Sequence, residues 1–375
     1  MEKKYLTSRR AILLICVFIF GSTAILGFGS KVKQDTWISL LIAYALTIPL
    51  ALLYARIMHL YPSKNIYDIM QILFGKVFGS ILTILFVWYC LHLGALVVKN
   101  YSGFVVYWQM PESPELGIML IMIPVLIYVA KKGVYSLSKW TTLVFLLACI
   151  VIAVTTVVSI KNMRFENLLP VLEHNFNELL KNAYKVYAFP FAETVVFLTL
   201  ASYIPKKENP YKIYFSSLGI MALLLFIVSM RNLTVGGCEA VGLQPYPSYY
   251  VVKLININES LSRFESTVAL TYVLSGVGKI VICLIGAAKG ITKLVKIDDY
   301  KLLIVPCAVL IFALTSMLYR GTTQEINFIN YYGYYAIPFQ VVIPTLIWIT
   351  AEVKTRKQRK ATSSQKNNKM VNELS

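Results

Sequence analysis

The chain has 375 residues, of which 57% are hydrophobic and 14% charged, and its formal net charge is +18. A soluble domain of this length carries about 25% charged residues, so the composition excludes that class and predicts a protein embedded in a lipid bilayer. The Lys and Arg residues lie between apolar runs and in the C-terminal tail. This placement favours membrane topology over phosphate binding, and no nucleic-acid partner is expected.

Ten apolar stretches follow one another along the chain, and most approach the roughly 20 residues that a helix needs to cross a bilayer. The stretch at 116–130 is short and contains Pro124. The basic start of the chain resembles a signal peptide, but its apolar run continues to Gly29, so we expect a retained first helix. The sequence predicts an all-α integral membrane protein with about ten transmembrane helices. They cover residues 11–29, 36–55, 77–98, 116–130, 140–160, 186–204, 213–230, 267–288, 302–319 and 331–351.

The basic residues also predict the orientation. With the N-terminus in the cytoplasm, 24 Lys and Arg residues fall on the inner side and 9 on the outer side. Positive residues favour the cytoplasmic side, so both termini are expected there. We predict a cytoplasmic segment at 1–10, a permease-like domain at 11–353 and a disordered basic tail at 354–375. Two long outer segments, 161–185 and 231–266, are expected to carry short interfacial helices or partner surfaces.

Helix-weakening residues occur in the first span of each half of the chain. Paired interruptions of this kind are typical of transporters built from inverted repeats, in which half-helix ends form a binding site at mid-membrane. They predict a five-plus-five inverted repeat with broken first and sixth helices, in which repeat one covers about 11–160 and repeat two about 186–353. Alternatively, Gly and Pro permit close packing or a kink. The breaks contain Gly21, Ser22, Thr23 and Ala24 in the first helix, and Phe189, Pro190 and Phe191 in the sixth.

Two ionisable residues lie deep in the predicted spans. Glu193 follows Pro190 by three residues, where the dipole of the second half-helix favours an anion, so it is a candidate for binding an ammonium group or exchanging protons. Lys279 lies near the middle of 267–288, where an unpaired ammonium costs about 3 kcal/mol. We therefore predict that the two residues pair, either structurally or as part of a ligand site. Lys279 could instead stand where other transporters bind sodium.

Further candidates complete the predicted ligand site, and no chemistry beyond binding is expected. His92 is interpreted as a packing residue in preference to a proton carrier. The six cysteines show no metal-binding spacing, and no nucleotide-binding or hydrolase motif occurs. We therefore predict neither an enzyme nor a cofactor or metal site. The remaining predicted ligand-binding residues are Tyr89, Leu93, Thr271 and Ser275.

Together with the ten spans, several short motifs resemble the spore germination permeases, the membrane B subunits of nutrient-germinant receptors. The motifs are Pro190-Phe191-Ala192-Glu193-Thr194-Val195-Val196, Arg263-Phe264-Glu265-Ser266, Trp37, Leu169-Pro170-Val171 and the basic tail. The resemblance implies the inverted-repeat fold of the amino-acid/polyamine/organocation transporters and a location in the inner membrane of the spore. It also implies a small germinant, often an amino acid, at the broken helices. The implied partners are a larger A subunit and a C subunit lipoprotein.

One departure from the family pattern concerns the first break. Where relatives often have Gly-x-Gly, this chain has Ser22-Thr23-Ala24. Three functions therefore stay open: a germinant-sensing subunit, an autonomous proton- or sodium-coupled amino-acid transporter, and a scaffold that keeps the fold without binding a ligand. The resemblance favours the sensor.

Overall fold

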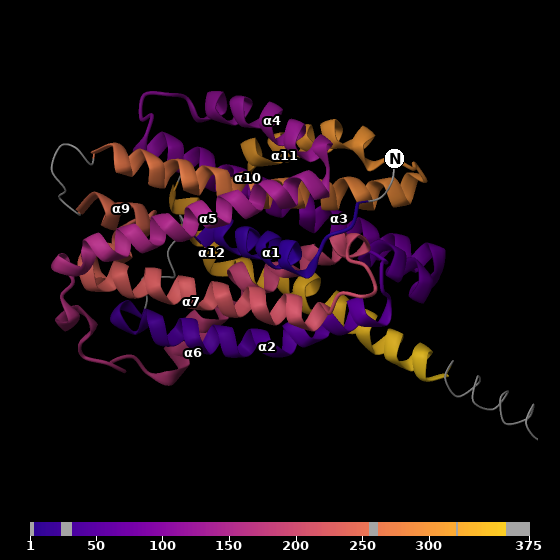
Figure 1. Ribbon diagram of the computed structural model, residues 1–375, viewed down its shortest axis with the longest axis horizontal. Coiled ribbons are helices and arrows are strands. Elements are labelled where there is room, and N and C mark those ends of the chain that lie inside the picture. The colour runs from indigo at the N-terminus through magenta and orange to yellow at the C-terminus, as the bar shows by residue number, and fades with distance from the viewer. Residues whose placement is uncertain (1–3, 24–31, 255–261, 320–321, 358–375) are drawn as a thin grey trace, which may run out of the picture.

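The computed structural model describes residues 4–23, 32–254, 262–319 and 322–357. Within these ranges the regular structure is entirely helical (Figure 1). The helix that contains α12 continues through a π-helical turn, η8 (Pro338–Val342), to residue 357. The α-helices are α1 (Ser8–Thr23), α2 (Thr36–Leu60), α3 (Ile66–Trp108), α4 (Glu115–Lys132), α5 (Val134–Ser159), α6 (Phe176–Val186), α7 (Pro210–Gly236), α8 (Cys238–Leu243), α9 (Pro247–Leu254), α10 (Ser262–Val295), α11 (Ile304–Leu318) and α12 (Thr322–Ile337).

Eight helical segments of the described chain are long and apolar enough to cross a membrane. Two of the ten predicted spans are not among them, for different reasons. Helix α1 has only 16 described residues, and α4 has 18 but includes Glu115, Lys131 and Lys132. Both still run alongside the longer helices in the bundle (Figure 1). The fold class is therefore confirmed as all-α and membrane-spanning.

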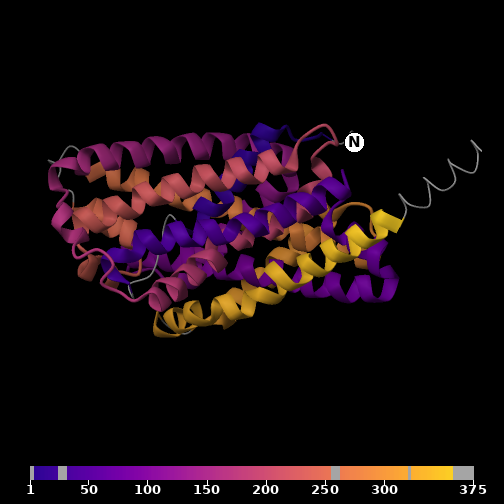
Figure 2. The same cartoon turned by 90° about the horizontal axis from the view of Figure 1, so that it is seen from below.

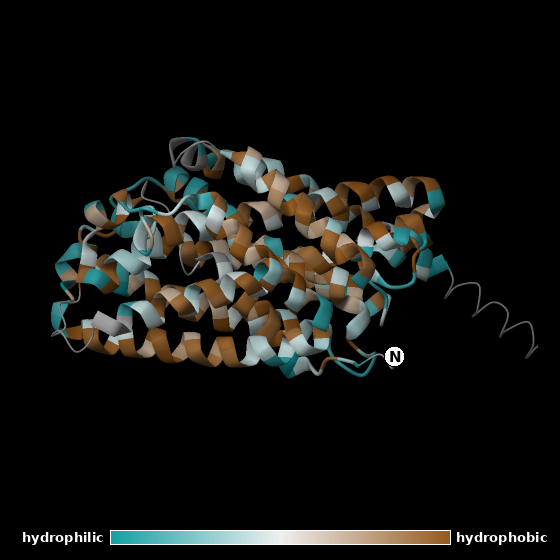
Figure 3. Cartoon of the chain, turned by 90° about the horizontal axis from the view of Figure 1, so that it is seen from above, coloured by the Kyte–Doolittle hydropathy of each residue, from teal (hydrophilic) through white to brown (hydrophobic). Residues whose placement is uncertain are grey.

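Large apolar side chains cover the outside of the bundle. Met317 is 82% exposed, Val77 75%, Ile121 70% and Leu143 69%. Hydrophobic residues run along the helices, whereas most of the hydrophilic ones gather toward the two ends (Figure 3). Contiguous apolar surface of this kind is stable in lipid, where every backbone hydrogen bond must be made internally and helices satisfy that condition.

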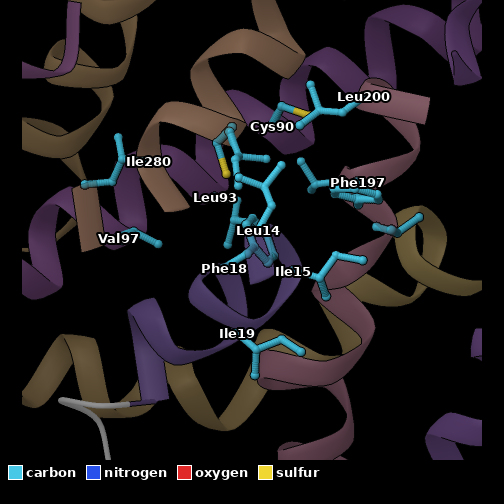
Figure 4. Packing of buried hydrophobic residues seen from close by; sticks show 14 of the residues in the cluster. Leu14, Ile15, Phe18, Ile19, Cys90, Leu93, Val97, Phe197, Leu200 and Ile280 are labelled. Carbon is cyan, nitrogen blue, oxygen red and sulfur yellow. The ribbon is translucent and has the colours of Figure 1, made fainter. Parts of the chain in front are cut away.

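Helix α1 lies inside the bundle and contacts α10, α7 and α5. Its side chains Leu14, Ile15, Phe18 and Ile19 are at most 2% exposed. They point into a cluster with residues of α3, the 3₁₀ segment η5 (Ala192–Tyr203) and α10 (Figure 4). Because α1 is held on several sides, its end at Thr23 is fixed in the centre of the protein.

The sixth membrane-spanning segment begins earlier than the predicted residue 186. Asn175 caps the N-terminus of α6 by accepting a 3.0 Å hydrogen bond from the backbone N–H of Glu178. The segment then runs through α6, a π-helical turn, η4 (Tyr187–Phe191), and η5. Part of the predicted outer segment 161–185 therefore belongs to this element, and the interruption lies near its middle.

The other long outer segment differs from its prediction at its start. Arg231 is not in a loop but near the end of α7, where it is 2% exposed. Two short helices, α8 and α9, follow it, as expected for that segment. They lie at the end of the bundle away from the start of α1 and the end of the last helix (Figures 1 and 2).

Candidate functional site

The broken sixth helix is confirmed by its backbone. Phe189 has φ −135° and ψ 114°, which are extended values, between the helical residues of α6 and those of η5. Helical hydrogen bonding is interrupted there, so carbonyl groups of the break need other partners. The first break is only partly visible: α1 ends at Thr23, whereas Ala24 and the side chain of Ser22 lie outside the described residues.

Side chains from two other helices supply those partners. Gln340 of η8 donates from Nε2 to the Ala188 carbonyl oxygen at 2.9 Å. The Tyr54 hydroxyl of α2 lies 3.2 Å from the Ala192 carbonyl oxygen and 2.6 Å from that of Gln340. The break is thus stabilised from outside its own helix, by α2 on one side and the last helix on the other.

Glu193 and Lys279 form a buried ion pair directly after the break. Both side chains are 0% exposed, and the Lys279 ammonium donates to Oε2 of Glu193. The ammonium also lies over the rings of Phe18 and Phe189, 4.9 Å and 5.2 Å from their centroids. The pairing expected for the two deep charges is therefore present, and it joins η5 to α10 beside α1.

A chain of hydrogen bonds ends on the same carboxylate. Tyr332 of α12 donates to Oε1 of Glu193 at 2.5 Å. Because that bond uses the tyrosine's proton, the 3.3 Å contact between the hydroxyls of Tyr89 and Tyr332 is donated by Tyr89. Gln340 Nε2 in turn donates to the Tyr89 hydroxyl at 2.9 Å. Every donor in the chain points toward Glu193, so each of its carboxylate oxygens has a partner.

A cavity of about 370 Å³ extends from Glu193 and Tyr332 to α8 and α9. Four predicted site residues line it: Thr23, Leu93, Phe189 and Glu193. The cavity therefore connects the break with the end of the bundle that carries the two short helices. The other polar lining residues are Lys33, Thr36, Asn100, Asn182, Lys185, Ser229, Asn232, Gln244, Ser248, Tyr319, Asn330 and Tyr332.

Other predicted site residues have different surroundings. The carbonyl oxygen of Gly21 accepts a 2.5 Å hydrogen bond from Tyr101, and a Cβ atom at Gly21 would lie 2.7 Å from the Ser275 carbonyl oxygen. Ser275 and Thr271 donate to carbonyl groups of their own helix. The ring of Phe191 packs 6.4 Å from that of Tyr44. None of these four predicted residues lines the cavity, so Gly21, Thr271, Ser275 and Phe191 support its walls from behind.

Two aromatic predictions also have clear outcomes. Tyr89 reaches Glu193 only through Tyr332. His92 packs among aromatic rings, stacked 5.6 Å from Trp88, and its Nδ1 has no hydrogen-bond partner. It therefore lies in an apolar contact, as the packing interpretation predicts.

Sequence reasoning missed Tyr332 and Gln340. With 25 tyrosines in the chain, one tyrosine carries little signal. Gln340 offered a better one, because it is a polar side chain two residues after Pro338 in the middle of a predicted span. A buried amide in a membrane helix needs partners, and a broken helix supplies them.

The family follows from comparison with known proteins. The family model described as "Spore germination protein" matches residues 5–325, which is most of the chain. The chain belongs to the spore germination protein family. Family and fold are those of membrane receptors and transporters, and the family is consistent with receptor-subunit partners.

Individual relatives extend the match over nearly the whole chain at low identity. Spore germination protein KB of Bacillus subtilis is 22% identical over 366 residues, covering 96% of this chain and 98% of that protein. Spore germination protein GerQB of Bacillus cereus is 21% identical over 362 residues, covering 94% and 98%. The crystal structure of MhsT in complex with L-phenylalanine has a TM-score of 0.66 at 13% identity, covering 93% of this chain and 89% of that one. This likeness supports the inverted-repeat fold predicted for the family member.

The hydrogen bond from Tyr332 gives a first prediction. Tyr332→Phe removes the donor to Oε1 of Glu193 and keeps the ring, so we expect a loss of about 1.5–3 kcal/mol in the free energy of unfolding. Chemical denaturation of the purified protein in detergent measures it. Tyr331→Phe is the matched control, because Tyr331 is 69% exposed. Equal stability of the two variants would contradict the role given to Tyr332.

Proposed function

We propose that this protein is the membrane subunit of a nutrient-germinant receptor, and that a small germinant binds in the cavity beside the broken sixth helix. The observation that carries the proposal is the position of the buried Glu193–Lys279 pair and Tyr332 at the end of that cavity. A volume of about 370 Å³ falls in the range of small-molecule sites. Binding that favours one arrangement of the helices would shift the conformational equilibrium and trigger germination.

Family membership supports the wider setting. The expected location is the inner membrane of the spore, with both termini in the cytoplasm, where the basic residues would lie. The expected partners are an A subunit and a C subunit lipoprotein. An amino acid is the expected germinant, and the fold shared with MhsT, whose crystal structure contains L-phenylalanine, supports that class of ligand.

An autonomous amino-acid transporter is the second candidate, because MhsT has the same fold. The paired state of Glu193 bears on its coupling ion. Lys279 already neutralises the carboxylate, so a sodium ion bound to Glu193 would have to displace the ammonium. Uptake of labelled amino acids by vesicles that contain this chain alone distinguishes the candidates: flux favours the transporter, and its absence favours the sensor.

The direct test narrows the cavity. Leu93 is 2% exposed and lines the cavity, so we expect Leu93→Phe to lower or shift the germination response of spores to individual amino acids. Release of dipicolinic acid across a panel of amino acids measures the response, with protein abundance checked by immunoblot.

Leu126→Phe is the matched control, because Leu126 is also 2% exposed but lies on α4 and does not line the cavity. A Leu93→Phe protein of normal abundance that responds normally to the whole panel would overturn the assignment of the cavity as the germinant site.

A further inference from the structure

The charges around the cavity are unequally distributed. Glu193 is the one acidic residue among the described residues that line it, and both of its oxygens are already engaged. The described lining includes two lysines, Lys33 and Lys185. An ammonium group on a ligand would therefore meet no unoccupied carboxylate in the described wall of the cavity.

Asn182 provides a donor of the opposite kind. It is 4% exposed and lines the cavity, and its side-chain Nδ2 is buried without a hydrogen-bond partner. A buried N–H without a partner costs about 1–3 kcal/mol, which a bound acceptor would recover. Lys185 follows three residues later on α6, so the two side chains share a face of the helix. Its ammonium donates to Oδ1 of Asn330 at 2.6 Å.

Arg231 adds a buried positive charge behind the same wall. Its guanidinium donates to Oδ1 of Asn232 at 2.8 Å and 3.2 Å and to Oγ1 of Thr155 at 2.6 Å. In the described part of the chain no carboxylate contacts it. Because Asn232 accepts from Arg231, its amide N–H points elsewhere and donates to Ser248 at 3.0 Å.

Asn232 and Ser248 both line the cavity, so they separate the guanidinium of Arg231 from the space where a ligand would lie. A buried guanidinium without a counter-ion makes its surroundings favourable for an anion. The unpaired amide of Asn182, the ammonium of Lys185 and the charge of Arg231 therefore favour the same kind of ligand group.

We propose that the cavity recognises the carboxylate of its ligand through the Asn182 and Lys185 face of α6, and that the ligand's amino group is not required. The proposal rests on the proposed function and narrows it to ligands that carry a carboxylate. Arg231 acts as a positioning residue through Asn232. Binding is expected to tolerate loss of the amino group and to be abolished when the carboxylate becomes an amide.

Matched ligand series test this on the purified full-length chain in lipid nanodiscs. The first series is L-leucine, L-leucinamide, 4-methylpentanoate and 3-methylbutylamine; the second is L-alanine, L-alaninamide, propionate and ethylamine. In at least one series the two carboxylates are expected to raise the midpoint of thermal unfolding, whereas the amide and the amine leave it unchanged. An equal shift by the amide or the amine, or no shift by any carboxylate, overturns the proposal.

Variants of α6 connect the effect to the named residues. Asn182→Asp places a negative charge against the ligand, so we expect it to remove the carboxylate-dependent shift. Asn182→Leu removes only the donor and is expected to weaken carboxylate binding about tenfold, the equivalent of one charge-assisted hydrogen bond. Unchanged carboxylate binding by either variant overturns the proposal.

Asn175→Asp is the matched control, because Asn175 is exposed on the same helix and aspartate caps a helix equally well. The two proposals can fail separately. Germination by amides or amines that Leu93→Phe abolishes would overturn the carboxylate inference and keep the germinant site. Normal germination of Leu93→Phe spores would overturn the germinant site, whatever the purified chain binds.

Discussion

Replacing Lys279 by methionine is expected to lower the free energy of unfolding by about 3–5 kcal/mol. The change leaves the Glu193 carboxylate 0% exposed with only the Tyr332 hydroxyl as a partner, and an uncompensated buried charge has this cost. The measurement is chemical denaturation of the purified protein in detergent, together with its abundance in membranes. Lys212→Met, at an exposed lysine, is expected to match the unmodified protein.

The double variant separates the ion pair from packing. Glu193→Gln combined with Lys279→Met removes both charges and is expected to recover most of the stability lost in the single variant. Reversing both charges should likewise be better tolerated than reversing either one. If Lys279→Met were as stable as Lys212→Met, or if the double variant were the less stable of the two, the pair would not hold these helices together.

The second large effect is expected at Gly276 of α10. A Cβ atom at this position would overlap the ring of Tyr101 from α3, whose hydroxyl donates to the Gly21 carbonyl oxygen at 2.5 Å. Gly276→Leu therefore forces α3 and α10 apart and pulls Tyr101 away from α1. We expect a loss of about 3 kcal/mol or more in the free energy of unfolding, measured in the same way.

Gly117 of α4 is the control for this substitution. A Cβ atom there would make an ordinary contact, 3.7 Å from Pro114, so Gly117→Ala is expected to change stability little. Gly276→Ala should still be markedly less stable than Gly117→Ala. Similar behaviour of the two alanine variants would mean that the close approach of Tyr101 is not required.

The helices and the central ion pair could be predicted because each has a strong physical signal. Apolar runs of membrane length have few alternatives, and two deep charges in one chain must find partners in hydrocarbon. The break at Phe189 was predictable as well, because Pro190 interrupts hydrogen bonding in the middle of an apolar run.

What the sequence could not reveal depends on contacts between distant helices. Tyr332 and Gln340 meet the break only after the last helix packs beside it. Arg231 was predicted in a loop because charged residues at the end of an apolar run are usually solvated, yet it is buried by α5 and its own neighbour Asn232. The wall of the cavity is likewise a property of packing, and no periodicity in the sequence specifies it.

The clamp formed by Gln340 has a mechanical consequence. One amide group holds both the Ala188 carbonyl oxygen and the Tyr89 hydroxyl, so the broken helix cannot tilt away from the last helix without giving up hydrogen bonds worth about 1 kcal/mol each. The last helix continues to Lys354, whose ammonium donates to the Ile72 carbonyl oxygen at 2.9 Å. A displacement that begins at the ligand cavity would therefore be carried as a rigid stroke along one rod to the far end of the bundle.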